Sequence, residues 1–262
     1  MKAGDFALRK RDGGRISMLT AYDYSFARLV DSSPVDCVLV GDSAAMVMHG
    51  CKSTIDATPE MMASHVSAVA RGAPSKFIVA DMPFLSFRSG LKHAMDCAAL
   101  LLRAGAHAVK LEGVDGHEDV IRAMTSADIP VMGHLGLTPQ SILKLGAYRV
   151  QGRSPSAAEA IFCQASRLEG AGCFALVLEC VPDEVARRVT VALSIPTIGI
   201  GAGPHTDGQV LVLQDALGLC AERTPRFVKK FMDGRAIVGE AISRFDAEVK
   251  SGVFPQKEHS CG

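Results

Sequence analysis

Short runs of apolar and β-branched residues recur along this chain, separated by longer segments with helical periodicity. Eight runs have the length and composition of buried strands: ISMLTA (16–21), CVLVGD (37–42), FIVAD (77–81), AVKLEG (108–113), PVMGHLG (130–136), FALVLEC (174–180), PTIGIGAG (196–203) and QVLVLQDA (209–216). Near-continuous apolar strands that alternate with helices indicate a parallel sheet covered on both faces. Eight such strands in a chain of 262 residues predict a (β/α)8 barrel.

The sequence also repeats itself in a way that fits a barrel of βα units. LLRAGAHAVKLEG (101–113) is similar to RLEGAGCFALVLEC (167–180), and IPVMGHLG (129–136) is similar to IPTIGIGAG (195–203). No linker, charge block or low-complexity stretch interrupts the pattern. We therefore expect one domain over residues 1–262, with a frayed tail over 250–262.

Composition limits the classes of function. Hydrophobic residues make up 48% of the chain, and 28 Lys and Arg balance 28 Asp and Glu, so the totals give no sign of nucleic-acid binding. No apolar run approaches the length of a membrane span, and the polar, basic N-terminus does not resemble a signal peptide. The 8 cysteines show no CxxC pair and no metal spacing. We expect reduced thiols in a cytoplasmic protein.

Charged or polar side chains stand at or near the carboxyl ends of five predicted strands. They are Asp42, Asp81, Glu112, His134 and Glu179. In a (β/α)8 barrel all strand carboxyl ends open on one face, where active sites are built. Taken singly, each residue could cap the next helix or face solvent. Their recurrence on different strands favours a common site over separate coincidences.

Strand periodicity adds Lys110 to this group. Lys110 and Glu112 fall on one side of their strand, and Val109 and Leu111 fall on the other. If the leucine side faces the helices, Lys110 points into the barrel, where a buried lysine needs a partner. The same parity turns Glu179 inward.

Four carboxylates, one histidine and one lysine therefore converge on one rim of the predicted barrel. Crowded carboxylates repel one another unless a cation lies among them, and all-oxygen ligation suits Mg²⁺ rather than zinc. The cluster predicts a metal site. Two other candidates are weaker: GIGAG (199–203) has Pro204 where a dinucleotide fingerprint needs glycine, and Ser43 and Ser86 lack the partners of a nucleophilic serine.

Motifs along nearly the whole chain resemble the ketopantoate hydroxymethyltransferase family. They are TAYDYSFARLVD (20–31), LVGDSAAMVMHG (39–50), VADMPF (79–84), VKLEG (109–113), GHLGLTPQS (133–141), VQGR (150–153), LVLECVP (176–182), IPTIGIGAG (195–203) and TDGQVLVLQDALG (206–218).

The resemblance implies a (β/α)8 barrel of the phosphoenolpyruvate/pyruvate type. It also implies transfer of the one-carbon unit of 5,10-methylenetetrahydrofolate to 3-methyl-2-oxobutanoate, giving 2-dehydropantoate in pantothenate synthesis. Members of the family are homo-oligomers, often decamers, and we expect the same here.

The resemblance also assigns roles to residues of this sequence. Asp42 and Asp81 would bind Mg²⁺, with Glu112 as a further ligand through water. The substrate contacts would be Asp42, Ser43, Asp81, Lys110 and His134. Glu179 would be the catalytic base.

Some residues depart from the family pattern. This chain has GDSAA (41–45) where members commonly have GDSLG, and TIDAT (54–58) where they have TLPVT; CKS (51–53) also differs. One alternative is therefore a paralogue that acts on a related 2-oxo acid. A second is a metal-dependent carbon–carbon lyase or mutase of the same superfamily. A third is a barrel that only senses an oxo acid, which the intact acidic residues disfavour.

Overall fold

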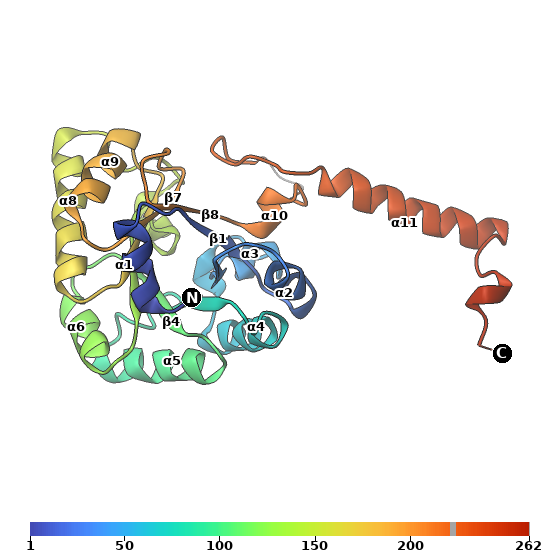
Figure 1. The fold of residues 1–262 in the computed structure, drawn as a ribbon, viewed down its shortest axis with the longest axis horizontal. Helices are drawn as coiled ribbons and strands as arrows, with labels where there is room; N and C mark the ends of the chain where they lie inside the picture. The colour runs from blue at the N-terminus through green and yellow to red at the C-terminus, as the bar shows by residue number, and fades with distance from the viewer. Residues whose placement is uncertain (221–223, 262) are drawn as a thin grey trace. The chain divides into compact units, whose positions relative to one another are not determined.

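Eight parallel strands form a closed barrel in a computed structural model that describes residues 1–220 and 224–261 (Figure 1). Each strand pairs with its neighbours in chain order, and β1 pairs with β8 in a register that sets Ile16 opposite Gly208. The strands are β1 (Ile16–Thr20), β2 (Cys37–Val40), β3 (Phe77–Asp81), β4 (Ala108–Glu112), β5 (Val131–Gly136), β6 (Ala175–Glu179), β7 (Thr197–Ile200) and β8 (Gly208–Leu211). The predicted (β/α)8 barrel is confirmed.

Each predicted apolar run contains a strand, but the last run does not stay extended. Residues 209–216 were expected to form one strand, whereas β8 ends at Leu211 and Leu213–Ala216 is a short helix, α10. Leucine, glutamine and alanine favour a helix over a strand. The extended prediction was therefore wrong for the second half of this run.

The unit Met1–Val212 contains the barrel and the helices that cover it. Its helices are α1 (Ala3–Arg11), α2 (Tyr24–Asp31), α3 (Ala44–Val47), α4 (Pro59–Gly72), α5 (Leu91–Arg103), α6 (Glu118–Ser126), α7 (Ile142–Leu145), α8 (Pro155–Gly170) and α9 (Asp183–Ala192), with 3₁₀ turns η1 (Thr54–Asp56) and η2 (Pro139–Ser141). Thr58 and Ser154 cap α4 and α8, each before a proline in the first turn. A capping side chain and a proline in the first turn both favour the beginning of a helix.

Alternate strand residues build two separate cores. Val109 and Leu111 belong to the outer core, between the strands and the helices. Ala108 and Val177 belong to the inner core, inside the barrel. Phe6 of α1 joins the inner core, where its ring centroid lies 5.5 Å from that of Phe77 and 5.1 Å from that of Phe174. Because Phe77 begins β3 and Phe174 precedes β6, α1 closes the amino end of the barrel.

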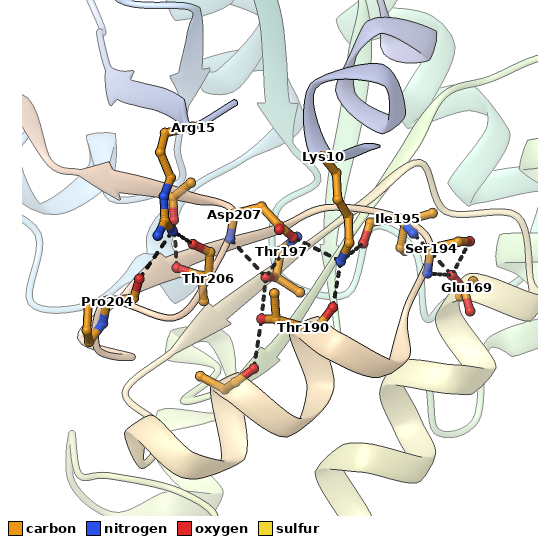
Figure 2. Close-up of polar contacts among 12 residues, drawn as sticks. Lys10, Arg15, Glu169, Thr190, Ser194, Ile195, Thr197, Pro204, Thr206 and Asp207 are labelled. Atoms are coloured by element: carbon orange, nitrogen blue, oxygen red, sulfur yellow. Dashed lines mark hydrogen bonds and ion pairs between the residues drawn. The ribbon is translucent and has the colours of Figure 1, made fainter. Parts of the chain in front are cut away.

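A polar network ties α1 to the amino ends of β7 and β8 (Figure 2). Lys10 Nζ donates to the backbone carbonyls of Thr190 (2.6 Å) and Ile195 (3.2 Å) and lies 3.0 Å from Asp207 Oδ2. The same carboxylate oxygen accepts the backbone N–H of Thr197 at 2.8 Å. These contacts hold the short connection between β7 and β8 at the amino end of the barrel.

The second unit, Leu213–Gly262, contains α10, α11 (Gly234–Ser251) and the turn η3 (Lys257–His259). Val238, Ile242, Phe245 and Val249 recur at helical spacing along α11 and are 46%, 63%, 60% and 46% exposed.

Among the described residues, no helix combines the length and the apolarity that a membrane crossing requires. The single domain and the frayed tail stay predictions.

Candidate active site

The strand register places the charged residues side by side at the carboxyl end of the barrel. Asp81 on β3 lies opposite Lys110 on β4, and Glu112 on β4 lies opposite His134 on β5. Glu179 ends β6. The inner core residues Val79, Ala108 and Val177 have the same strand parity, so these side chains belong to the face that lines the barrel interior, as was predicted for Lys110 and Glu179.

Asp42, Asp81 and Lys110 form the first half of the cluster, and each is at most 5% exposed. The backbone N–H of Asp42 donates to Asp81 Oδ2 at 3.0 Å. Lys110 Nζ lies 3.1 Å from Asp81 Oδ1, an ion pair that lacks hydrogen-bond alignment and leaves this oxygen without a hydrogen bond. The buried lysine therefore has the anionic partner that its position requires.

Glu112, His134 and Glu179 form the second half. Lys110 Nζ lies 3.2 Å from His134 Nδ1, and since an ammonium group only donates, the network assigns Nδ1 as the acceptor and places the proton on Nε2. His134 Nε2 lies 3.2 Å from Glu179 Oε2 but is not aligned for a hydrogen bond. Glu112 Oε1 lies 3.6 Å from His134 Nδ1. His134 therefore presents an unused N–H beside Glu179.

Burial and crowding shift the pKa of most of these groups. Burial, and then Asp81, raise the pKa of Asp42 to about 7. Burial and the neighbouring acids raise the pKa of Glu112 well above its ordinary value. Burial raises the pKa of Glu179 to about 7, with Lys110 acting in the opposite direction. Asp42 and Glu179 therefore ionise near neutral pH.

The cationic side chains respond in opposite ways. Burial opposes the charge of Lys110, but Asp81, Glu112 and Asp42 outweigh it and the pKa of Lys110 is raised. Burial, and then Lys110, lower the pKa of His134 well below its ordinary value. Lys110 is thus charged and His134 neutral at pH 7.

No three His, Cys, Asp or Glu side chains are close enough to form a ready-made metal cage within residues 1–220 and 224–261. The arrangement instead brings Asp42 and Asp81 together at neighbouring strand ends, where the backbone N–H of Asp42 lies 3.0 Å from Asp81 Oδ2. Mg²⁺ commonly uses one or two protein carboxylates and takes its other ligands from substrate and water. The donor set therefore fits Mg²⁺ and does not fit a four-ligand zinc site.

Two neighbours of the cluster were not singled out from the sequence. Gln140, in η2, donates from Nε2 to Asp42 Oδ2 at 2.8 Å. The Tyr22 hydroxyl lies 2.8 Å from Ser43 Oγ, beside Asp42. Both residues lie within motifs quoted above, but neither is charged, so neither was noticed as part of the acidic cluster. Their contacts with the rim depend on the paths of the loops that carry them, which only the structure shows.

His49, His65, His107 and Ser86 make other contacts. His49 Nε2 and His65 Nε2 are 2.8 Å apart in the part of the chain after β2. His107 stacks on Phe77 at 5.5 Å, and Ser86 Oγ donates to the carbonyl of Pro83 at 2.7 Å. None of these contacts forms a nucleophilic triad.

The barrel is similar to the folds of several solved structures. Phosphonopyruvate hydrolase, solved with oxalate and Mg²⁺, is 14% identical with a TM-score of 0.65 and covers 98% of this chain and 93% of its own. A 2,3-dimethylmalate lyase of the PEP mutase/isocitrate lyase superfamily is 18% identical with a TM-score of 0.63, over 99% and 91%. At these identities the likeness concerns the fold.

Sequence relatives are much closer. The 3-methyl-2-oxobutanoate hydroxymethyltransferase of Coxiella burnetii is 52% identical over 262 residues, covering 100% of this chain and 98% of the relative. That of Legionella pneumophila is 51% identical over 261 residues, covering 99% and 100%. The family model of ketopantoate hydroxymethyltransferase matches residues 1–257. This chain belongs to the ketopantoate hydroxymethyltransferase family.

Proposed function

We propose that this protein transfers the one-carbon unit of 5,10-methylenetetrahydrofolate to 3-methyl-2-oxobutanoate and releases 2-dehydropantoate for pantothenate synthesis. The observation that carries the proposal is the buried rim where Glu179, with its pKa raised to about 7, faces a neutral His134 and a charged Lys110. A base of this strength beside fixed positive charge suits removal of a proton next to a carbonyl group.

Asp42 and Asp81 would hold Mg²⁺, with Glu112 contributing through water. Support comes from the Asp81 Oδ1 atom, which is buried with the Lys110 ammonium at 3.1 Å as its one polar neighbour among the described residues, and from burial, followed by the charge of Asp81, which together raise the pKa of Asp42. When bound, the ion would supply Lewis-acid stabilisation of the negative charge that develops on the keto oxygen.

The other rim residues would bind and orient the oxo acid. Lys110 would add fixed positive charge where negative charge accumulates, and its ion pair with Asp81 holds it in place. His134 would donate its Nε2 proton to a substrate oxygen, because Nδ1 is occupied as an acceptor from Lys110. Ser43 would contact the substrate from the loop after β2.

Glu179 would act as the base. Its carboxylate would take the proton from C3, and the electron pair of that C–H bond would form the enolate. Water would hydrolyse the methylene bridge of the folate, breaking both C–N bonds, so that the one-carbon unit is released as formaldehyde and the amines leave as tetrahydrofolate. C3 would then attack the formaldehyde carbon, and the carbonyl oxygen, which came from water, would take a proton and become the hydroxyl group of the product. Proton transfer of this kind contributes about 10²–10⁴-fold to a rate.

The departures from the family pattern leave the exact oxo acid as a separate question. Ala44 and Ala45 of GDSAA are buried just after Ser43, so a changed pocket would lie close to the substrate. A small change in an apolar pocket is worth about 1–3 kcal/mol, so a paralogue would show shifted preference rather than a strict switch. Comparing kcat/KM for 3-methyl-2-oxobutanoate with that for straight-chain 2-oxobutanoate tests this.

One assay separates the proposed transfer from a lyase or mutase activity. The protein is incubated with a panel of 2-oxo acids and phosphonates, with and without Mg²⁺ and 5,10-methylenetetrahydrofolate. We expect 2-dehydropantoate only when both Mg²⁺ and the folate are present. Turnover of an oxo acid or phosphonate without folate would favour the lyase or mutase.

We also propose that the protein is a cytoplasmic homo-oligomer, with a decamer as the expected size. The apolar stripe of Val238, Ile242, Phe245 and Val249 on α11 supports self-association, because exposed apolar patches commonly mark interfaces. Light scattering should show that Phe245→Asp lowers the mass in solution, whereas Ser243→Asp on the same helix leaves it unchanged. A monomeric wild type would contradict the proposal.

A further inference from the structure

We propose that Gln140 is a positioning residue that fixes which carboxylate oxygens of the rim are free to bind the metal; this inference rests on the magnesium site proposed above. Gln140 lies in η2, the turn that follows β5, and its side chain is 6% exposed. Gln140 carries no charge, although buried acids surround it. Its role therefore follows from the hydrogen bonds that it makes to them.

Both N–H groups of the Gln140 side chain are used. Nε2 donates to Asp42 Oδ2 at 2.8 Å and to the backbone carbonyl of Met82 at 2.9 Å. Two acceptors on one nitrogen define the orientation of the amide, since a flipped amide would turn its own oxygen toward both of them. Met82 follows β3, so the side chain of Gln140 links the ends of β2 and β3.

The backbone of the same residue reaches a third strand. The N–H of Gln140 donates to Glu112 Oε2 at 3.1 Å, at the end of β4. One residue of the loop after β5 therefore holds one oxygen of Asp42 through its side chain and one oxygen of Glu112 through its main chain. Both contacts are buried.

In both Asp42 and Glu112, Gln140 therefore donates a hydrogen bond to one of the two carboxylate oxygens and not to the other. Asp42 Oδ2 and Glu112 Oε2 are taken by Gln140, and Asp81 Oδ2 is taken by the N–H of Asp42. Among the described residues, the second oxygen of Asp42 accepts no hydrogen bond, whereas Asp81 Oδ1 is in an ion pair with Lys110 Nζ at 3.1 Å and Glu112 Oε1 lies 3.6 Å from His134 Nδ1. Hydrogen bonds to the outer oxygens of metal ligands orient the ligands, and their loss typically weakens metal binding by about 10–100-fold.

The test uses Gln140→Met, which has a similar length and no donor. Gln164→Met is the matched control, because Gln164 Nε2 donates to Asp115 Oδ2 at 2.7 Å in an exposed place on α8. The readout is the affinity for Mg²⁺ and for Mn²⁺ alone, measured by calorimetry without substrate. We expect Gln140→Met to bind about 10–100-fold more weakly and Gln164→Met to bind like the wild type.

A kinetic readout distinguishes positioning from a general structural role. Because the loss lies in metal affinity, saturating Mg²⁺ should restore most of kcat in Gln140→Met, whereas a distorted site would keep kcat low at every Mg²⁺ concentration. If Gln140→Met does not fold, Gln140→Asn carries the test, since its amide is one methylene too short to reach both acceptors.

The outcomes separate this inference from the proposed function. A wild type that binds neither Mg²⁺ nor Mn²⁺ would defeat the metal site itself. A wild type that binds the ions, together with a folded Gln140 variant of equal affinity, would overturn only the role of Gln140. Low kcat at saturating Mg²⁺ would overturn it as well.

Discussion

Replacing Glu179 by glutamine should stabilise the metal-free protein above neutral pH. Burial raises the pKa of Glu179 from 4.5 to about 7. A carboxyl group with a raised pKa in the folded state adds stability below its unfolded pKa, and that stability is lost as the pH rises through the folded pKa. Between about pH 4 and pH 7, Glu179 therefore makes the folded state progressively less stable, whereas a glutamine does not titrate.

The size of the effect follows from the shift. About 2.5 pKa units correspond to roughly 3 kcal/mol at 1.36 kcal/mol per unit. The Glu179 side chain is 18% exposed, so solvent screens only part of this. We therefore expect Glu179→Gln to match the wild type near pH 4 and to exceed its free energy of unfolding by roughly 3 kcal/mol at pH 8.

Urea unfolding with a chelator, at pH 4, 6 and 8 and one fixed protein concentration, measures this difference. Glu159→Gln is the control, because Glu159 is an exposed acid paired with Arg188 at 2.7 Å and its pKa is lowered by that contact. At high pH the free energy of unfolding of Glu159→Gln should not exceed that of the wild type. A constant difference between Glu179→Gln and the wild type at all three values would refute the reasoning.

Three further outcomes are expected. Asp81→Asn should lose most Mg²⁺-dependent activity while remaining folded, because a hard-cation site loses an anionic ligand; normal turnover at limiting Mg²⁺ would show that Asp81 is no ligand. The rate of C3 proton removal should rise with pH through about 7 as Glu179 ionises, and a flat profile from about pH 6 to 8 would exclude this base. Phe6→Ala should lower the free energy of unfolding by about 3–5 kcal/mol, because Phe6 is buried between Phe77 and Phe174; a loss under about 1 kcal/mol in denaturant unfolding would mean that α1 does not close the inner core.

The barrel could be predicted because most strands are buried on both faces and so appear as apolar runs, although Ser17 in β1 and Gln209 in β8 are exposed. The rim could be predicted because strand parity and parallel register send Lys110, Glu112 and Glu179 to one end and one side. The last run was predicted too long, since apolar composition alone does not separate the end of β8 from the start of α10.

Other features lay beyond sequence reasoning for a physical reason. Gln140 acts through a loop whose path depends on the packing of η2, so its spacing from Asp42 along the chain carries no signal. The hydrogen-bond roles of the two His134 nitrogens depend on the 3.2 Å contact with Lys110, which exists only in the folded barrel. Periodicity identifies the side a residue faces, but it does not identify the atom it contacts.

The most direct test of the account is exchange of the C3 proton of 3-methyl-2-oxobutanoate into D₂O without folate, followed by NMR. This isolates proton removal from one-carbon transfer. The wild type should exchange when Mg²⁺ is present, Glu179→Gln should exchange about 10²–10⁴-fold more slowly while still binding substrate, and His134→Asn should lose less. Exchange at the wild-type rate in Glu179→Gln, with collapse in His134→Asn, would contradict the account and make His134 the base.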